Sequence, residues 1–233
     1  DKTEAFEYAQ KLAEWLNDRK IPVEIASAQE PLGNAVHAAS ATDISGKTVS
    51  IFGCGPIGCC LIGLCKSYGA TRIFAVDIVD YRLKLAKDMG ADTIIDGKSN
   101  HVEDEILKAT DGRGVDVFFE MSGAPPSFGQ GFKTLKSGGT AVFFGLPSKP
   151  IEVDVAKWIV FKDARVRGVF GRRLFSTWYQ TAEVLKARMV DLSKVITHRF
   201  ELEEFTKAFA LMKSGRCGKI IMYPGTRRGS KGF

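Results

Sequence analysis

The chain has 233 residues and a net charge of +6; 45% of its residues are apolar and 26% are charged. These values are typical of a folded globular domain, so they exclude an intrinsically disordered chain, a collagen-like repeat and a coiled coil. Lysines and arginines are interspersed with acids along most of the chain, and the clearest basic cluster is in the tail (Arg227, Arg228 and Lys231). We therefore expect no nucleic-acid partner, because such a partner favours a basic stripe with interleaved aromatic residues.

The uncharged run Val49–Cys65 is too short, and too often interrupted by glycine and proline, for a membrane span. The first segment is amphipathic and has no apolar core of the kind found in a signal peptide. Four of the five cysteines lie within or beside this run, and none forms a Cys-x-x-Cys pair (Cys54, Cys59, Cys60, Cys65 and Cys217). We expect a cytoplasmic protein with reduced, buried thiols and no membrane association.

Residues 1–21 are expected to form an N-terminal helix whose origin the sequence does not explain. Its apolar residues recur at helical spacing over Asp1–Lys20. Residues 22–42 are expected to be linker helices, in short pieces broken at Pro31 and Gly33.

From residue 43 to residue 190, strand-like and helix-like runs alternate. We predict strands over 48–53, 72–77, 93–96, 115–121, 139–145 and 165–170, and helices over 56–68, 80–89, 102–110, 126–135, 155–161 and 174–187. The strands read as apolar throughout, which is typical of a parallel sheet covered on both faces. The sequence therefore predicts an α/β fold with a Rossmann-type, doubly wound, parallel six-stranded sheet.

Residues 191–233 depart from this rhythm. We predict a strand over 196–200, a helix over 201–214 and a strand over 218–224. The helix carries Phe205, Ala208, Phe209 and Met212 at the spacing of one face.

The most informative motif is a G-x-G-x-x-G that joins the first predicted strand of the sheet to the helix after it. Gly53 suits a tight turn, Gly55 lets the backbone approach a pyrophosphate, and Gly58 permits close packing. Pro56 and Ile57 then open a helix whose N-terminus attracts phosphate. The motif predicts a dinucleotide site.

An acid ends the next predicted strand. Asp77 follows Gly58 by about 20 residues, the separation expected of a carboxylate that accepts the hydroxyl of an adenosine ribose. Because a carboxylate repels a 2′-phosphate, we predict NAD over NADP. Arg82 is placed to reach the adenosine side of the cofactor. A capping or surface role for Asp77 remains the alternative.

Several stretches together resemble one family, the zinc-dependent L-threonine 3-dehydrogenases of the medium-chain alcohol dehydrogenase superfamily. The resemblance covers about residues 22–224. Its most specific parts are the runs Glu-Met-Ser-Gly-Ala-Pro and Thr-His-Arg-Phe, and the matching stretches are Glu30–His37, Gly53–Gly58, Glu120–Pro125, Phe144–Pro147, Gly168–Arg172 and Ile196–Phe200.

The resemblance implies oxidation of L-threonine by NAD⁺ to 2-amino-3-oxobutanoate and NADH. It implies that Glu30 lies at a catalytic zinc and can ligate it, and it supports the cofactor roles of Asp77 and Arg82. It also places Ser122 and Gly123 beside the cofactor, and Gly145 and Leu146 near the nicotinamide.

Further implications of the resemblance concern the ends of the chain and its assembly. Residues 43–190 correspond to the NAD-binding domain, and residues 191–233 to a segment that completes a catalytic domain. The resemblance also implies that remnants of that catalytic domain lie at both ends of the chain. A homo-oligomer, a dimer or a tetramer joined through sheet edges, is implied as well.

The chain departs from the family pattern in its zinc ligands. Its histidines are His37, His101 and His198, none of them in a His-Glu pair, and Glu30 is the one ligand that can be named, whereas a catalytic zinc needs about three. Zinc is therefore doubtful in this chain, and we expect the chain alone to be inactive. Two alternatives remain open: a truncated, non-catalytic module that binds NAD or dimerises, and a polyol dehydrogenase resembling sorbitol dehydrogenases.

Overall fold

The computed structural model describes residues 21–224 together with residues 7, 10 and 14. The predicted helix over residues 1–20 therefore lies almost entirely outside the described residues.

A six-stranded sheet forms the centre of the structure, with every neighbouring pair parallel and the strand order β3-β2-β1-β4-β5-β6. This is the Rossmann-type doubly wound sheet that the sequence predicts, since the order reverses between β1 and β4. The strands are β1 (Thr48–Phe52), β2 (Arg72–Asp77), β3 (Thr93–Asp96), β4 (Val115–Glu120), β5 (Leu135–Phe143) and β6 (Arg165–Gly168).

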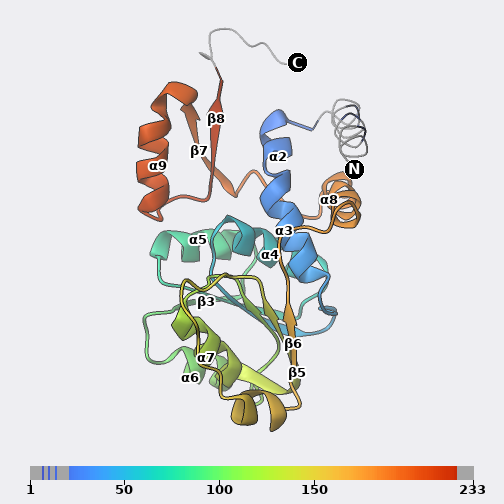
Figure 1. Cartoon of the computed structure of the whole chain (residues 1–233), viewed down its shortest axis with the longest axis vertical. Helices are drawn as coiled ribbons and strands as arrows, with labels where there is room; N and C mark the ends of the chain where they lie inside the picture. The colour runs from blue at the N-terminus through green and yellow to red at the C-terminus, as the bar shows by residue number, and fades with distance from the viewer. Residues whose placement is uncertain (1–6, 8–9, 11–13, 15–20, 225–233) are drawn as a thin grey trace.

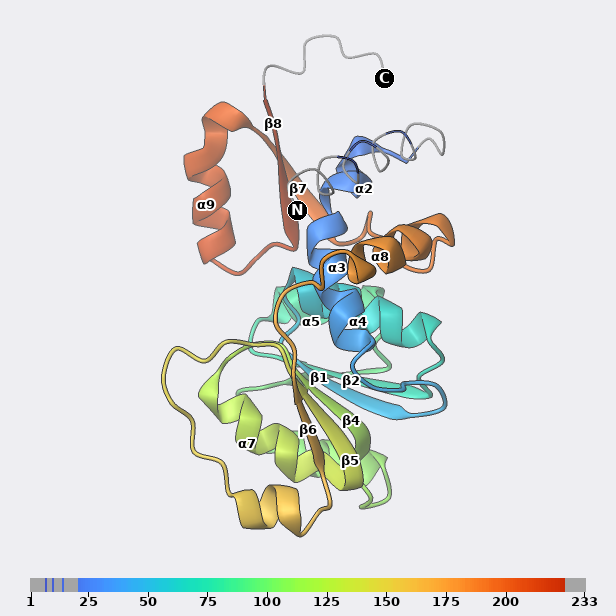
Figure 2. The same ribbon diagram turned by 45° about the vertical axis from the view of Figure 1, so that its right-hand side comes forward.

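Helices cover both faces of this sheet (Figures 1 and 2). One layer contains α3 (Gln29–Ala39), α4 (Pro56–Ser67) and α5 (Asp80–Asp88), and the opposite layer contains α6 (Val102–Ala109) and α7 (Pro125–Thr134). The short α2 (Val23–Ser27) precedes α3, and α8 (Ser176–Lys186) packs against α3.

Neighbouring residues of the central strands face two separate cores. Ile51 and Phe119 pack into the core beneath α3 and α4, whereas Phe52 and Phe118 pack into the other core with Phe132 of α7. All of these side chains are at most 1% exposed. Because both faces are buried, the central strands are apolar runs rather than alternating patterns, as predicted.

The predicted break at Pro31 and Gly33 is wrong, because α3 runs without interruption through both residues. Pro31 lies in the first turn, where a missing N–H removes no intrahelical hydrogen bond. Gly33 has a packing role: a methyl group there would lie 2.4 Å from Cδ of Arg172.

The prediction that all strands are apolar is wrong for β6. Its four residues are exposed and two of them are arginines, because among the described strands β6 pairs with β5 alone, at one edge of the sheet. Strand β6 also ends at Gly168, two residues earlier than predicted, and β5 begins at Leu135, four residues before the predicted start. The short helix predicted over 155–161 is a single π-helical turn, η1 (Ala156–Val160).

The C-terminal elements form a separate small unit on the α4 and α5 side of the sheet (Figures 1 and 2). They are β7 (Ile196–Glu201), η2 (Leu202–Glu204), α9 (Phe205–Lys213) and β8 (Lys219–Tyr223), and β7 pairs with β8 in parallel. Arg199 donates from Nε to Glu24 Oε1 at 2.9 Å, which ties β7 to α2.

The apolar face predicted for the last helix is only partly buried. Ala208 is buried, while Phe205, Phe209 and Met212 of α9 are each about half exposed. Among the described residues, no helix combines the length and the apolarity that a membrane span requires.

Candidate functional site

The glycine loop has the backbone geometry that its sequence predicts. Gly53 has a φ of +102°, and a methyl group there would lie 2.7 Å from the backbone nitrogen of Ser122. At Gly58 a methyl group would lie 2.0 Å from the carbonyl oxygen of Gly53. A methyl group at Gly55 would meet no described atom within 4 Å. Two of the glycines therefore permit close packing, and Gly55 faces open space.

Helix α4 begins directly at this open space. Gly55 is its N-cap residue, with a φ of −65°, and Pro56 is its first residue. Among the described residues, no side-chain hydrogen bond caps the start of this helix. The first-turn amides of a helix have no intrahelical acceptors, and here they lie beside the open space at Gly55. Such a helix N-terminus is suited to a phosphate group.

Asp77 ends β2 beside the loop and is 6% exposed. Its Oδ2 accepts from the amide of Cys54 at 2.7 Å, and its Oδ1 accepts from the amide of Val79 at 3.0 Å. The carboxylate thus holds the glycine loop, and each of its oxygens retains acceptor capacity for a further donor. The backbone role and the predicted ribose role are compatible.

Arg82 of α5 lies beside this carboxylate, with its Nη1 3.9 Å from Oδ2 of Asp77. Its Nε is buried and has no hydrogen-bond partner among the described residues. A buried donor without an acceptor is uncommon in a folded protein.

The turn after β4 and the segment after β5 are packed against each other. Gly123 has a φ of +70°, and a methyl group there would lie 2.5 Å from the carbonyl oxygen of Leu146. Gly145 donates from its amide to the carbonyl of Glu120 at 3.0 Å. Ser122 hydrogen-bonds through its amide to the Glu120 carboxylate at 3.0 Å.

Two adjoining hollows gather part of the predicted set. The strand-end hollow, of about 330 Å³, is lined by Gly53, Asp77, Arg82 and Ser122 together with Ile78, Pro126, Ser127 and others. The α9 hollow, of about 370 Å³, is lined by Glu30, Pro56, Ile57 and Arg82 together with Phe209, Met212, Lys219 and others. Arg82 lines both hollows, so the two hollows meet at this side chain.

The remaining predicted residues lie outside the lining of both hollows. The lining of the two hollows does not include Gly55, Gly58, Gly123, Gly145 or Leu146. The sequence patterns assigned no site role to Glu120, the buried acid that orders the turn after β4. The signal available in the sequence was an acid at the end of an apolar strand, two residues before Ser-Gly. The sequence patterns also assigned no site role to the residues of α9 and β8 that line the α9 hollow.

Glu30 is the second residue of α3, and its Oε1 accepts from Nδ2 of Asn34 at 2.7 Å. The described part of the chain holds no group of three or more His, Cys, Asp or Glu side chains placed to bind a metal ion. The five thiols are buried, and burial raises the pKa of Cys60 to about 12. The described residues therefore offer no set of ligands that fits a catalytic zinc.

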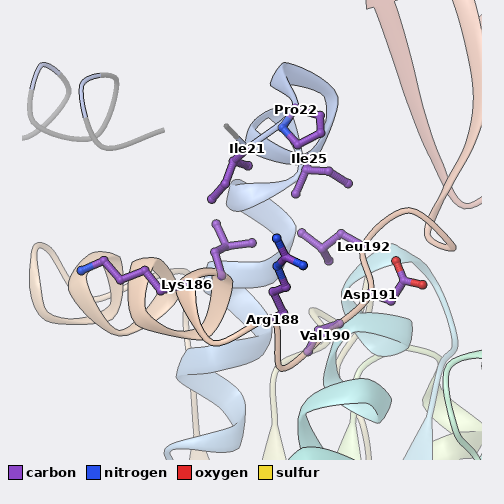
Figure 3. A pocket seen from close by; sticks show the side chains of 9 residues that line it. Ile21, Pro22, Ile25, Lys186, Arg188, Val190, Asp191 and Leu192 are labelled. Atoms are coloured by element: carbon purple, nitrogen blue, oxygen red, sulfur yellow. The ribbon is translucent and has the colours of Figure 1, made fainter. Parts of the chain in front are cut away.

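A further hollow of about 510 Å³ lies away from the glycine loop, between α2 and the end of α8 (Figure 3). Aliphatic side chains form most of its wall, and Arg188 points between Ile25 and Leu192. It contains none of the predicted site residues.

The fold and the site define a class: a Rossmann-type domain with an open glycine loop at the point where the strand order reverses. The family model described as zinc-binding dehydrogenase matches residues 56–187. The chain belongs to this family of zinc-binding dehydrogenases.

Two curated relatives are both named L-threonine 3-dehydrogenase. The protein from Caldanaerobacter subterraneus is 43% identical over 211 residues, which are 90% of this chain and 61% of that protein. The protein from Bacillus subtilis is 41% identical over 210 residues, which are 90% of this chain and 60% of that protein. The chain thus spans about three fifths of the length of these relatives.

Solved structures of the same superfamily share the fold. The 2R,3R-butanediol dehydrogenase of Bacillus subtilis is 30% identical with a TM-score of 0.79, over 88% of this chain and 58% of that one. An alcohol dehydrogenase of Thermotoga maritima is 32% identical with a TM-score of 0.74, over 83% of this chain and 55% of that one.

Proposed function

We propose that this chain is the NAD-binding portion of an L-threonine 3-dehydrogenase, which converts L-threonine and NAD⁺ into 2-amino-3-oxobutanoate and NADH. The observation that carries the proposal is the open glycine loop at the N-terminus of α4 with Asp77 beside it. The names of the relatives with more than 40% identity supply the substrate. The residues present fit NAD, as Arg82 has a buried donor without a described partner at the junction of the two hollows.

In this proposal the chain binds and orients the cofactor. Asp77 accepts the ribose hydroxyl in the strand-end hollow, and the first-turn amides of α4 hold the pyrophosphate. Arg82 donates to the adenosine side, while Ser122 and the turn after β4 line the path of the cofactor. NAD⁺ supplies a hydride acceptor when bound, and the protein supplies its position.

The domain boundaries are part of the proposal. Residues 43–190 form the cofactor domain, and residues 191–233 correspond to the part that completes a catalytic domain in the longer relatives. Gly145 and Leu146 lie toward the nicotinamide, and Glu30 lies toward the position of the metal. These roles rest on the resemblance and on the α9 hollow, which Glu30 lines.

The chain alone is expected to hold no stoichiometric zinc and to show no threonine oxidation, since its described residues offer no cluster of ligands. Metal analysis of the dialysed protein should find much less than one zinc per chain, and an assay with L-threonine, NAD⁺ and added zinc should show no NADH formation. One tightly bound zinc per chain, or threonine turnover, would contradict this expectation.

A polyol dehydrogenase is the second candidate, because a butanediol dehydrogenase shares the fold at 30% identity. The two substrates are distinguished by supplying the N-terminal portion of the Caldanaerobacter relative in trans. The proposal expects NADH formation with L-threonine and not with sorbitol or butanediol; the reverse preference would favour the polyol reaction. A third candidate, a module that binds NAD without turnover, would show saturable NADH binding and no turnover under either condition.

We also propose that the chain forms a homo-oligomer through the edge of β6. All four residues of β6 are exposed and the strand has one neighbour among the described strands, so its other edge can pair with that of a second copy. Light scattering should give at least twice the 25.5 kDa mass of one chain. Val166→Lys, which places a charge in this edge, should shift the protein toward monomer.

The matched control for this substitution is Val23→Lys on α2, where the valine is 77% exposed and remote from β6. It should leave the mass unchanged. A monomeric wild-type chain, or an oligomer insensitive to Val166→Lys, would contradict pairing through this edge.

A further inference from the structure

Glu120 is a carboxylate at the C-terminal end of β4 with no exposed surface. It accepts from the amides of Ser122 and Gly123, each at 3.0 Å, and from Oγ of Ser127 at 2.6 Å. The hydroxyl of Ser122 also donates to it. A buried charge is tolerated only when it is well solvated by the protein, and here hydrogen-bond donors from one turn and one helix provide that solvation.

These donors come from the elements that line the strand-end hollow. Ser122 belongs to the turn after β4, Ser127 belongs to the first turn of α7, and both line the hollow. The carboxylate, which does not itself line the hollow, therefore holds two of its walls together through these hydrogen bonds.

Glu120 also fixes the segment after β5. Its carbonyl oxygen accepts from the amides of Phe144 at 2.9 Å and Gly145 at 3.0 Å. A methyl group at Gly145 would lie 2.2 Å from Oε2 of Glu120 and 2.2 Å from the amide nitrogen of Gly123. The backbone of Glu120 thus holds the segment after β5, and its carboxylate leaves no room for a larger residue at Gly145, between that segment and the turn after β4.

We propose that Glu120 is a positioning residue for the dinucleotide: it does not touch the ligand but sets the shape of the strand-end hollow and joins it to the segment carrying Gly145. The proposal rests on the proposed binding of NAD. The role depends on acceptor chemistry, since an amide of the same size would turn an N–H group toward the N–H and O–H donors around it.

The test is the Glu120→Gln variant, with NADH, NADPH and AMP as probes in fluorescence and calorimetric titrations. We expect the affinities for NADH and for AMP to fall about tenfold, while the ratio of NADH affinity to NADPH affinity stays at the wild-type value because Asp77 is untouched. A merely structural role would lower the melting temperature and leave both affinities unchanged in the folded variant.

The matched control lies at the other end of the same strand. Asp116 accepts from the amide of Thr48 at 2.8 Å and from its Oγ1 at 2.7 Å, and it pairs with Lys136, all away from both hollows. Asp116→Asn should lower stability and leave NADH affinity unchanged. Equal losses of affinity in the two variants would overturn the proposal.

A second variant decides the case in which Glu120→Gln does not fold. Gly145→Ala keeps the charge of Glu120 but pushes a methyl group into its carboxylate. It should therefore weaken the binding of AMP as well as that of NADH. Normal AMP affinity in this variant would overturn the proposal. Failure of the wild-type chain to bind NADH would overturn the proposed function itself, whereas wild-type affinity in folded Glu120→Gln would overturn only the role of Glu120.

Discussion

Replacing Asp77 by glycine is expected to lower the affinity for NADH by about 10- to 100-fold and to raise the relative affinity for NADPH at least about tenfold. A hydrogen bond to a charged acceptor contributes about 1.5–3 kcal/mol, which corresponds to the first of these changes. Removing the carboxylate also removes the repulsion of a 2′-phosphate. Because Asp77 also accepts from two backbone amides, the variant should melt at a lower temperature. Fluorescence titrations with both cofactors below that temperature give the two affinities.

Asp96→Gly is the matched control for this prediction. Asp96 ends β3 directly beside Asp77 in the sheet register, but it is exposed and does not line the strand-end hollow. This variant should keep the wild-type affinities. An unchanged NADH to NADPH ratio in folded Asp77→Gly would remove Asp77 from its proposed role.

Two alanine substitutions in the glycine loop are expected to have separable effects. Gly55→Ala should change the free energy of unfolding by no more than about 0.5 kcal/mol, since its methyl group meets no described atom and its backbone is ordinary. It should nevertheless weaken NADH about tenfold or more, because the methyl group occupies the space proposed for the pyrophosphate. Gly58→Ala should destabilise the fold by about 1–3 kcal/mol, since its methyl group would overlap the carbonyl of Gly53.

Urea unfolding and NADH titration of both variants check this pair. Wild-type affinity in Gly55→Ala would place the phosphate elsewhere, and wild-type stability in Gly58→Ala would show that the loop relaxes without cost.

The sheet was predictable because its strands and helices alternate along the chain. Strands β1, β2 and β4 are buried on both faces, so their residue types alone indicate a covered parallel sheet. The errors arose where tertiary context decides. A proline disrupts a helix only beyond its first turn, and Pro31 lies in the first turn of α3. The position of β6 at the sheet edge permits arginines that a central strand would exclude.

The candidate site was predictable where one motif carries the chemistry. The glycine spacing and Asp77 indicate a dinucleotide loop from the amino-acid sequence alone, because the backbone conformation they require is local. Glu120 was missed because its role depends on donors from α7 and on contact with the segment after β5, and that arrangement exists only in the folded sheet. The residues of α9 and β8 that line the α9 hollow were missed because they too come together only in the folded chain.

The measurement that tests the central claim most directly is a titration of the purified wild-type chain with NADH, followed by the fluorescence of the cofactor. Binding at this glycine loop predicts a saturable change with one site per chain and a dissociation constant of about 1 μM to 1 mM, the range usual for cofactors and substrates of enzymes. AMP should displace the bound NADH by competing for the strand-end hollow, and NADPH should bind more weakly. A signal that rises linearly without saturation, or that AMP does not displace, would contradict the assignment of this chain as an NAD-binding domain.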